Sequence, residues 1–219
     1  MKSARRRGGF TPALAIHALT PLYDWGVALM GFGPSFIDRV AASLDLAGDE
    51  RLLDVGCGTG TLLAALAIRH PKARLVGIDA DPRMLARAAA KVPPGRAVAL
   101  IRAYAQALPF ADGAFDAVVS TLIFHHLSAG TKRAAIAEIR RVLRPGGTFL
   151  LADFGRPETA VQRILLGLGS LFDGRENMRA NLAGEVPGLL DDAGFAVTEA
   201  SPRYRAVQFL RAVNPPLRR

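Results

Sequence analysis

The chain has 219 residues, half of them hydrophobic, and its 28 Lys and Arg against 19 Asp and Glu give a formal net charge of +9. This length and apolar content allow one full core, so we expect a single domain. The single cysteine excludes an internal disulfide and a cysteine-based metal site, and no apolar run approaches the roughly 20 residues of a membrane span, so we expect a cytoplasmic protein without a metal.

The positive charge has two interpretations. An anionic partner, such as nucleic acid, a membrane surface or an acidic substrate, would account for it. Alternatively, the arginines are ordinary solvated surface residues. Apart from residues 5–7 and 140–141 they are scattered, and aromatic residues do not interleave with them. We favour the second interpretation, and keep nucleic acid as the alternative partner.

The first part of the chain precedes its central motif. Residues 1–10 are basic and are predicted to form a tail, and residues 11–47 a helical cap. A basic start followed by an apolar stretch also suggests a signal peptide, but Pro12 and Pro21 interrupt that stretch.

A glycine-rich turn at residues 52–60, LLDVGCGTG, is the centre of the sequence. Asp54 lies in an apolar run, glycines follow at positions 56, 58 and 60, and residues 61–69 favour a helix. The pattern therefore predicts a buried strand, a tight turn and a helix. Glycine permits positive φ and lets a ligand approach the backbone, whose N–H groups face it at the helix start. The spacing G-x-G-x-G differs from the G-x-G-x-x-G of many dinucleotide enzymes.

Alternating strands and helices are predicted after this turn. Asp81 and Pro82 suit the start of a helix, and a turn follows at residues 92–95. Strands are predicted at residues 74–79, 97–103, 115–120 and 148–154, helices at 131–143, 161–172 and 185–193, and a strand pair at 195–200 and 204–213.

Four motifs occur in order along the chain: the glycine turn with Asp54 before it, Asp79 at the end of the next apolar run, LPF at residues 108–110 and LRPGG at residues 143–147. In these motifs the chain resembles the class I S-adenosylmethionine-dependent methyltransferases, in particular the small-molecule group that includes the ubiquinone and menaquinone biosynthesis methyltransferases. The resemblance implies an α/β, Rossmann-like fold. Its seven-stranded sheet is mostly parallel with the last strand antiparallel, helices cover both faces, and an N-terminal helical cap precedes it.

The resemblance also implies how the chain is divided and what it binds. Residues 48–155 correspond to the cofactor-binding core, and residues 156–213 to substrate-side helices and the last strands. The implied cofactor is S-adenosyl-L-methionine. The implied cofactor-binding residues are Tyr23, Asp54, Gly56, Cys57, Gly58, Thr59, Gly60, Asp79, Ala80, Met84, Ala105, Gln106 and Ser120.

Several of these residues have a specific role in the family. Asp54 supports the glycine turn and meets the amino group of the methionine part or a bridging water, Asp79 holds the ribose hydroxyls, and a residue at the position of Met84 packs against adenine. Ordinary packing between helix and sheet is the alternative role for Met84. Tyr104 departs from the pattern, because the family has an acid there that accepts the adenine amino group. The N–H of Ala105 remains as an adenine contact.

The reaction implied by the resemblance is an in-line displacement at a sulfonium, so the protein mainly positions the reactants and excludes water, and no metal is needed. A phenol, thiol or activated ring carbon has to lose a proton. His125 and His126 follow the fourth predicted strand and are the candidate catalytic bases, because imidazole titrates near neutral pH. Ordering of the loop is the alternative role for either histidine. Cys57 is interpreted as a small packing residue.

The sequence therefore predicts methyl transfer to a small hydrophobic or aromatic acceptor, by a monomer or homodimer. The apolar character of the regions that flank the core carries the prediction of the acceptor. One alternative is an RNA or protein methyltransferase, which the basic charge alone supports, since residues 120–123 read STLI and not the (D/N)-P-P-(Y/F/W) type. The other is a catalytically silent cofactor-binding protein, or a nicotinamide enzyme.

Overall fold

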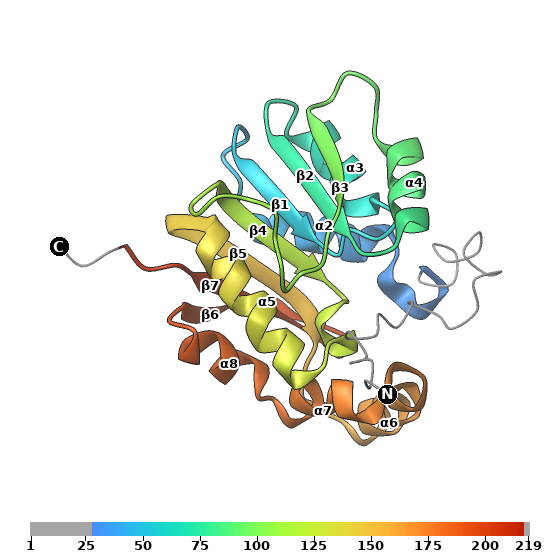
Figure 1. Ribbon diagram of the computed structural model, residues 1–219. Coiled ribbons are helices and arrows are strands. Elements are labelled where there is room, and N and C mark those ends of the chain that lie inside the picture. Colours follow the sequence, from blue (N-terminus) through green and yellow to red (C-terminus); the bar gives the residue numbers. More distant parts are fainter. Residues whose placement is uncertain (1–27, 217–219) are drawn as a thin grey trace, which may run out of the picture.

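A seven-stranded sheet forms the centre of the molecule in the computed structural model, which describes residues 28–216 (Figure 1). Its strand order is β3-β2-β1-β4-β5-β7-β6, and only β7 runs antiparallel to its neighbours. The strands are β1 Arg51–Val55, β2 Arg74–Asp79, β3 Val98–Arg102, β4 Phe115–Thr121, β5 Leu143–Phe154, β6 Ala196–Tyr204 and β7 Val207–Val213. The predicted mostly parallel sheet with an antiparallel last strand is confirmed.

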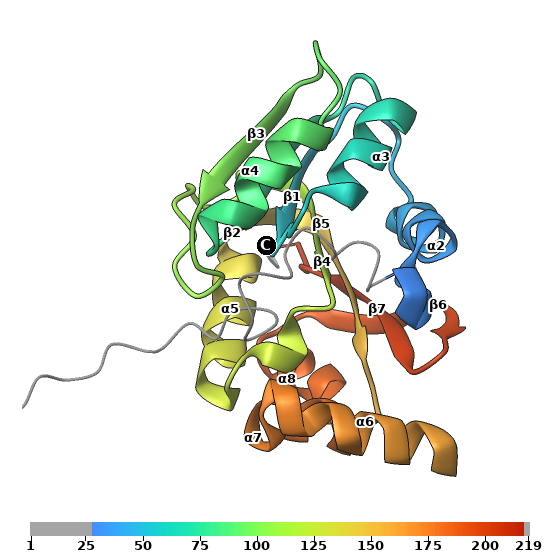
Figure 2. The same ribbon diagram turned by 90° about the vertical axis from the view of Figure 1, so that its right-hand side faces the viewer.

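Helices cover both faces of the sheet, as Figures 1 and 2 show. One face packs against α2 (Pro34–Leu44) and α3 (Thr61–Arg69), with α4 (Pro82–Lys91) beside α3. The other face packs against α5 (Ala129–Val142) and α8 (Val186–Asp192). The central strands are apolar along their length because both faces are buried by these helices.

Two further helices lie beyond the carboxyl end of β5: α6 (Ala160–Asp173) and α7 (Arg175–Ala183). Two short helical turns complete the described part, η2 (Ala28–Phe32) and η3 (Phe124–His126). The sequence did not predict α7. The residues of α7 are polar on average. The helix is capped by Gly184, whose φ of 78° suits glycine.

Two predicted boundaries are wrong for a physical reason. The LRPGG segment, which precedes the strand predicted at residues 148–154, is part of β5, where the pairing with β4 shifts register between Phe115 and Ala117. Between these two pairs β5 has more residues than β4, and the extra residues form an irregularity of the strand. The last two strands form a tighter hairpin than predicted, because β6 runs on to Tyr204 and Arg205 turns the chain with a φ of 56°.

Helix α3 begins at Thr61, as predicted. The residue before it, Gly60, is the N-cap and makes no side-chain cap. The tail at residues 1–10 and the first part of the predicted cap, residues 11–27 with Tyr23, lie outside the described residues.

Candidate active site

A cavity of about 1010 Å³ lies where the carboxyl ends of β1, β2 and β4 meet α2, α3 and η3. In open α/β sheets this is where ligands bind, at the point where the strand order reverses. Here β1 has β2 on one side and β4 on the other. The predicted site residues that line the cavity are Gly56, Cys57, Gly58, Thr59, Asp79, Ala80, Met84, Ala105, Gln106 and His126.

The glycine turn is fixed by hydrogen bonds to the end of β2. The N–H groups of Gly56 and Cys57 both donate to the carbonyl of Ile78 at 2.9 Å, and that of Gly58 donates to Asp79 Oδ2 at 2.9 Å. The glycines at 56, 58 and 60 all have positive φ, of 78°, 53° and 74°. L side chains rarely adopt this conformation, so the turn depends on glycine.

Two of these glycines are needed for different reasons. A Cβ at Gly60 would lie 2.7 Å from the Cβ of Ala88, so Gly60 lets α4 pack closely on α3. A Cβ at Gly58 would have no atom within 4 Å, because Gly58 faces the cavity. The missing side chain at Gly58 therefore leaves space for a ligand beside the backbone.

Two acidic side chains accompany the turn. Asp79 Oδ1 accepts the N–H of Asp81 at 2.8 Å, and burial raises the pKa of Asp79 although these backbone N–H groups act against the rise. Asp54 is 1% exposed, and both of its carboxylate oxygens lack a hydrogen-bond partner within the described part of the chain. Burial, and then the charge of Asp79, raises the pKa of Asp54 to about 8.

A buried carboxylate without a partner is unfavourable unless a donor or a cation meets it. Asp54 therefore favours a positively charged or hydrogen-bonding ligand group next to the glycine turn. Burial, followed by the charges of Asp54 and Asp79, raises the pKa of the Cys57 thiol. Cys57 is thus a neutral packing group, in agreement with the interpretation from sequence.

Four predicted site residues do not line the cavity: Asp54, Gly60, Ser120 and His125. Ser120 is fully buried, and its hydroxyl donates to the carbonyl of Val55 at 2.9 Å. It joins β4 to β1 directly beneath the glycine turn.

The two histidines have different environments. His125 is 3% exposed, and its Nδ1 lies 2.7 Å from Asp153 Oδ1. Burial opposes the ionisation of Asp153, but the charge and hydrogen bond of His125 and the N–H of Phe154 outweigh it, so the pKa of Asp153 is lowered. Asp153 also accepts the N–H of Phe124 at 2.6 Å, which fixes the short helix η3.

His126 faces the cavity from η3, with its ring centroid 4.0 Å from that of His125. Burial, and then the charge of His125, lowers the pKa of His126 to about 4. Its imidazole is therefore neutral at physiological pH and can accept a proton.

Several cavity residues were missed by the sequence reasoning. Lys91, the last residue of α4, donates to the hydroxyls of Thr59 and Thr61 at 2.8 Å each. Asn177 comes from the unpredicted helix α7, which the buried ammonium of Lys132 holds by a 2.6 Å bond to the Asn177 carbonyl. These contacts join segments far apart in the chain, and no local motif signals them.

Leu122 was also missed. It lines the cavity at the end of β4 with a φ of 54°, which a leucine rarely adopts. Its N–H donates to the carbonyl of Ala152 at 3.0 Å, so the strained backbone is fixed by the neighbouring strand. Strain of this kind concentrates at ligand sites.

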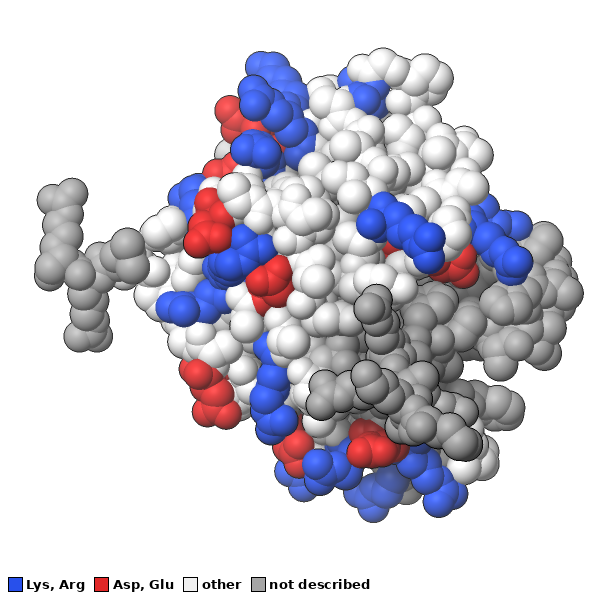
Figure 3. Space-filling view, in the orientation of Figure 1, with Lys and Arg blue, Asp and Glu red and all other residues white. Residues whose placement is uncertain are grey.

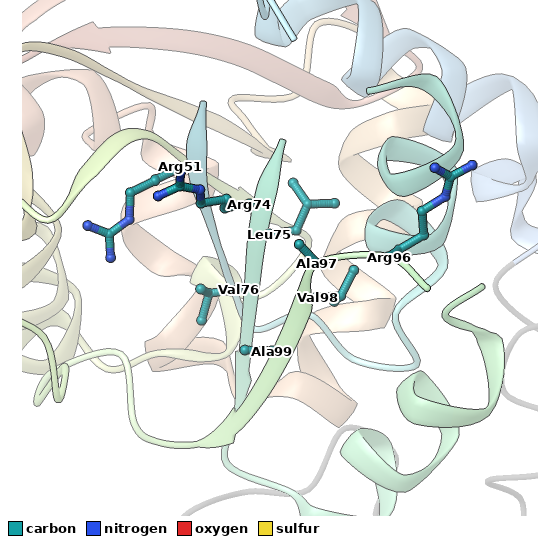
Figure 4. Close-up of a pocket in the computed structure, with 8 residues that line it drawn as sticks. All are labelled: Arg51, Arg74, Leu75, Val76, Arg96, Ala97, Val98 and Ala99. Carbon is teal, nitrogen blue, oxygen red and sulfur yellow. The ribbon is translucent and has the colours of Figure 1, made fainter. Parts of the chain in front are cut away.

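A second cavity, of about 620 Å³, lies at the opposite, amino ends of β1, β2 and β3. Arg51, Arg74 and Arg96 lie at its edge around small apolar side chains. Figure 4 shows Arg51 and Arg74 on one side and Arg96 on the other. Because the guanidinium groups do not converge, this cavity is not built for a single anion.

In the described residues, 28–216, no three His, Cys, Asp or Glu side chains gather as a possible metal site. No helix in that range is long and apolar enough to cross a membrane.

Comparison with known proteins agrees with the fold. A family profile described as "Methyltransferase domain" matches residues 52–147. A demethylmenaquinone methyltransferase of Thermus thermophilus is 36% identical over 213 residues, which cover 87% of this chain and 93% of that protein. A ubiquinone/menaquinone biosynthesis C-methyltransferase of Syntrophotalea carbinolica is 31% identical over 81% of this chain and 82% of that one. Magnesium protoporphyrin IX methyltransferase from Synechocystis, solved with bound SAH, has the same fold, with a TM-score of 0.64 over 90% of this chain and 98% of that chain at 21% identity.

The chain therefore belongs to the class I S-adenosylmethionine-dependent methyltransferases. The predicted family, enzyme class and cofactor are confirmed.

Proposed function

We propose that this enzyme methylates a small hydrophobic or aromatic acceptor of the quinol or phenol kind. The observation that carries the proposal is the apolar part of the wall of the cavity that His126 also lines. Its side chains are apolar and come from separate elements: Phe32, Ile37, Leu122, Ile123 and Leu127. Such a wall accommodates an apolar ring, and a few polar groups orient it. The names of the relatives from Thermus and Syntrophotalea point to quinone rings as acceptors.

The residues around the glycine turn fit S-adenosylmethionine. Gly58 leaves the space for its methionine part, and the unpartnered carboxylate of Asp54 suits the amino group of that part. Asp79 at the end of β2 suits the ribose hydroxyls, and Met84 and the N–H of Ala105 suit adenine. When bound, the cofactor supplies an electrophilic methyl group on a sulfonium. The protein holds it, orients the acceptor and excludes water.

His126 is the proposed base for an acceptor that has to lose a proton. It lies in the cavity and is neutral near pH 7, whereas His125 is buried behind it against Asp153. We therefore assign the catalytic role to His126 and a positioning role to His125. The proton passes from the acceptor to the imidazole of His126.

The proposal is tested in two stages. Isothermal titration with S-adenosylmethionine, and separately with its demethylated product, should show micromolar binding of both. A screen of quinols, phenols and small polar amines should then give turnover with the aromatic acceptors. Turnover with polar amines alone would contradict the proposed acceptor class, and transfer to RNA or protein would favour the alternative.

A further inference from the structure

Helix α6 carries an apolar stripe that faces away from the protein. Within the described residues, seven large hydrophobic side chains are exposed, and five of them lie on this helix. They are Val161, Ile164, Leu165, Leu168 and Leu171, each 54% to 64% exposed. At about 100° per residue their positions fall within an arc of roughly 120°, so they share one face of the helix.

The opposite face of α6 already has a partner. Leu166 and Ser170 are buried, and Leu166 packs with Met178 of α7 and Ala206 of the β6–β7 turn. The helix is thus anchored on one side and apolar on the other. Scattered single apolar residues are normal at a protein surface, but five that share one helix face mark a binding surface.

The place of α6 relates this stripe to the active site. The helix follows β5 and lies at the end of the molecule where the carboxyl ends of the parallel strands lie (Figure 2). It packs on α7, which contributes Asn177 to the cavity. A surface that binds this stripe therefore lies at the same end of the molecule as the active site.

The charge around the stripe is positive. Exposed arginines precede it, lie on α6 and follow on α7: Arg156, Arg163, Arg175 and Arg179. Two exposed acids lie among them, Glu158, which is paired with Arg203 at 3.0 Å, and Glu176 on α7, and the chain as a whole carries +9. Figure 3 shows Lys and Arg side chains gathered over the end of the molecule that holds α6 and α7, with some acidic ones among them.

We propose that α6 docks this enzyme on an anionic lipid surface, with the apolar stripe at the boundary of headgroups and acyl chains and the arginines on the headgroups. The stripe alone is too small for a stable dimer. A helix of 14 residues offers a strip of about 21 by 10 Å, against the roughly 800 Å² per partner of a standard interface. The choice of a membrane rests in part on the proposed hydrophobic acceptor, which would partition into lipid.

The test compares two isoleucines that are both 63% exposed. Ile164 lies on the α6 stripe, and Ile68 lies on α3, outside the cavity lining. The full chain and the variants Ile164→Glu and Ile68→Glu are sedimented with vesicles of phosphatidylcholine and phosphatidylglycerol, and with vesicles of phosphatidylcholine alone. We expect binding to the anionic vesicles, a loss of roughly tenfold or more in partition for Ile164→Glu, and little change for Ile68→Glu.

Two controls keep the result interpretable. Titration with S-adenosylmethionine should give the same affinity for all three proteins, which shows that the variants are folded. Sedimentation velocity shows whether Ile164→Glu changes the oligomeric state. Absence of vesicle binding, equal losses in the two variants, or a dimer that Ile164→Glu dissociates would each overturn the proposal. The vesicles contain no acceptor, so failure here leaves the proposed acceptor class unaffected.

Discussion

His125 Nδ1 lies 2.7 Å from Asp153 Oδ1, and both residues are at most 3% exposed. The same carboxylate accepts the N–H groups of Phe124 and Phe154, at 2.6 and 2.7 Å. One buried acid at the end of β5 thus fixes the helix η3, which presents His126 to the cavity.

Asp153→Asn should destabilise the fold by about 2–4 kcal/mol, because an amide replaces an ionised acceptor and leaves buried donors poorly paired. Asp116→Asn is the control. Asp116 pairs with Arg144, whose side chain is 52% exposed, and accepts the exposed N–H of Arg51 at 2.8 Å, so the substitution should remove about 1 kcal/mol or less. Urea unfolding measures both. Equal losses would show that the buried network contributes no more than a surface ion pair.

The glycine turn predicts losses of stability of different size for two alanine substitutions. Gly60→Ala places a Cβ 2.7 Å from the Ala88 Cβ and 2.9 Å from its Cα, so we expect a loss of about 3 kcal/mol or more in stability. Gly58→Ala meets no atom within 4 Å. Its stability should fall by only about 1–2 kcal/mol, for the left-handed backbone.

Cofactor binding completes this comparison. The new methyl group of Gly58→Ala projects into the space assigned to the cofactor, so its affinity for S-adenosylmethionine should fall by roughly tenfold or more. Thermal unfolding and isothermal titration on both variants check the two effects. A normal affinity of Gly58→Ala for S-adenosylmethionine would show that the cofactor does not occupy the space beside Gly58.

Asp54 predicts how the stability of the cofactor-free protein depends on pH. Its pKa is about 8 in the folded state against 3.8 as the reference, so the folded state binds the proton more tightly. The contribution of Asp54 to the free energy of unfolding is therefore fully present below pH 4 and is lost as the pH rises towards 8.

Asp54→Asn removes this dependence. Its free energy of unfolding, relative to the native protein, should increase on the order of 2–4 kcal/mol across that window. Chemical unfolding at several pH values, without cofactor, measures the difference. Parallel pH curves for the two proteins would mean that the Asp54 carboxyl ionises normally.

His126→Asn should lower kcat by about 10²- to 10⁴-fold for an acceptor that has to lose a proton. Because the pKa of His126 is about 4, the base form is present at every pH well above that value. The rate of the native enzyme should therefore show no titration of this group near neutral pH. The affinity for S-adenosylmethionine serves as the control and should not change. An unaltered kcat would mean that His126 is not the base, and that the proton leaves the acceptor without it or to another group.

The sequence by itself determined the parts of the site that are contiguous. The glycine turn, Asp54, Asp79 and the strand–helix order follow from local patterns, because backbone conformation and hydrophobic periodicity act over a few residues. These patterns were enough to predict the family, the sheet and the cofactor.

Only the tertiary structure decided the parts that depend on contacts between distant segments. Asp153 meets His125 across 28 residues, and Lys91 meets Thr59 across 32. Two adjacent histidines looked equivalent in sequence, yet one is buried against an acid and the other lines the cavity. That difference arises from the packing of β5 beside β4, which brings an ionised carboxylate to one ring and apolar walls to the other.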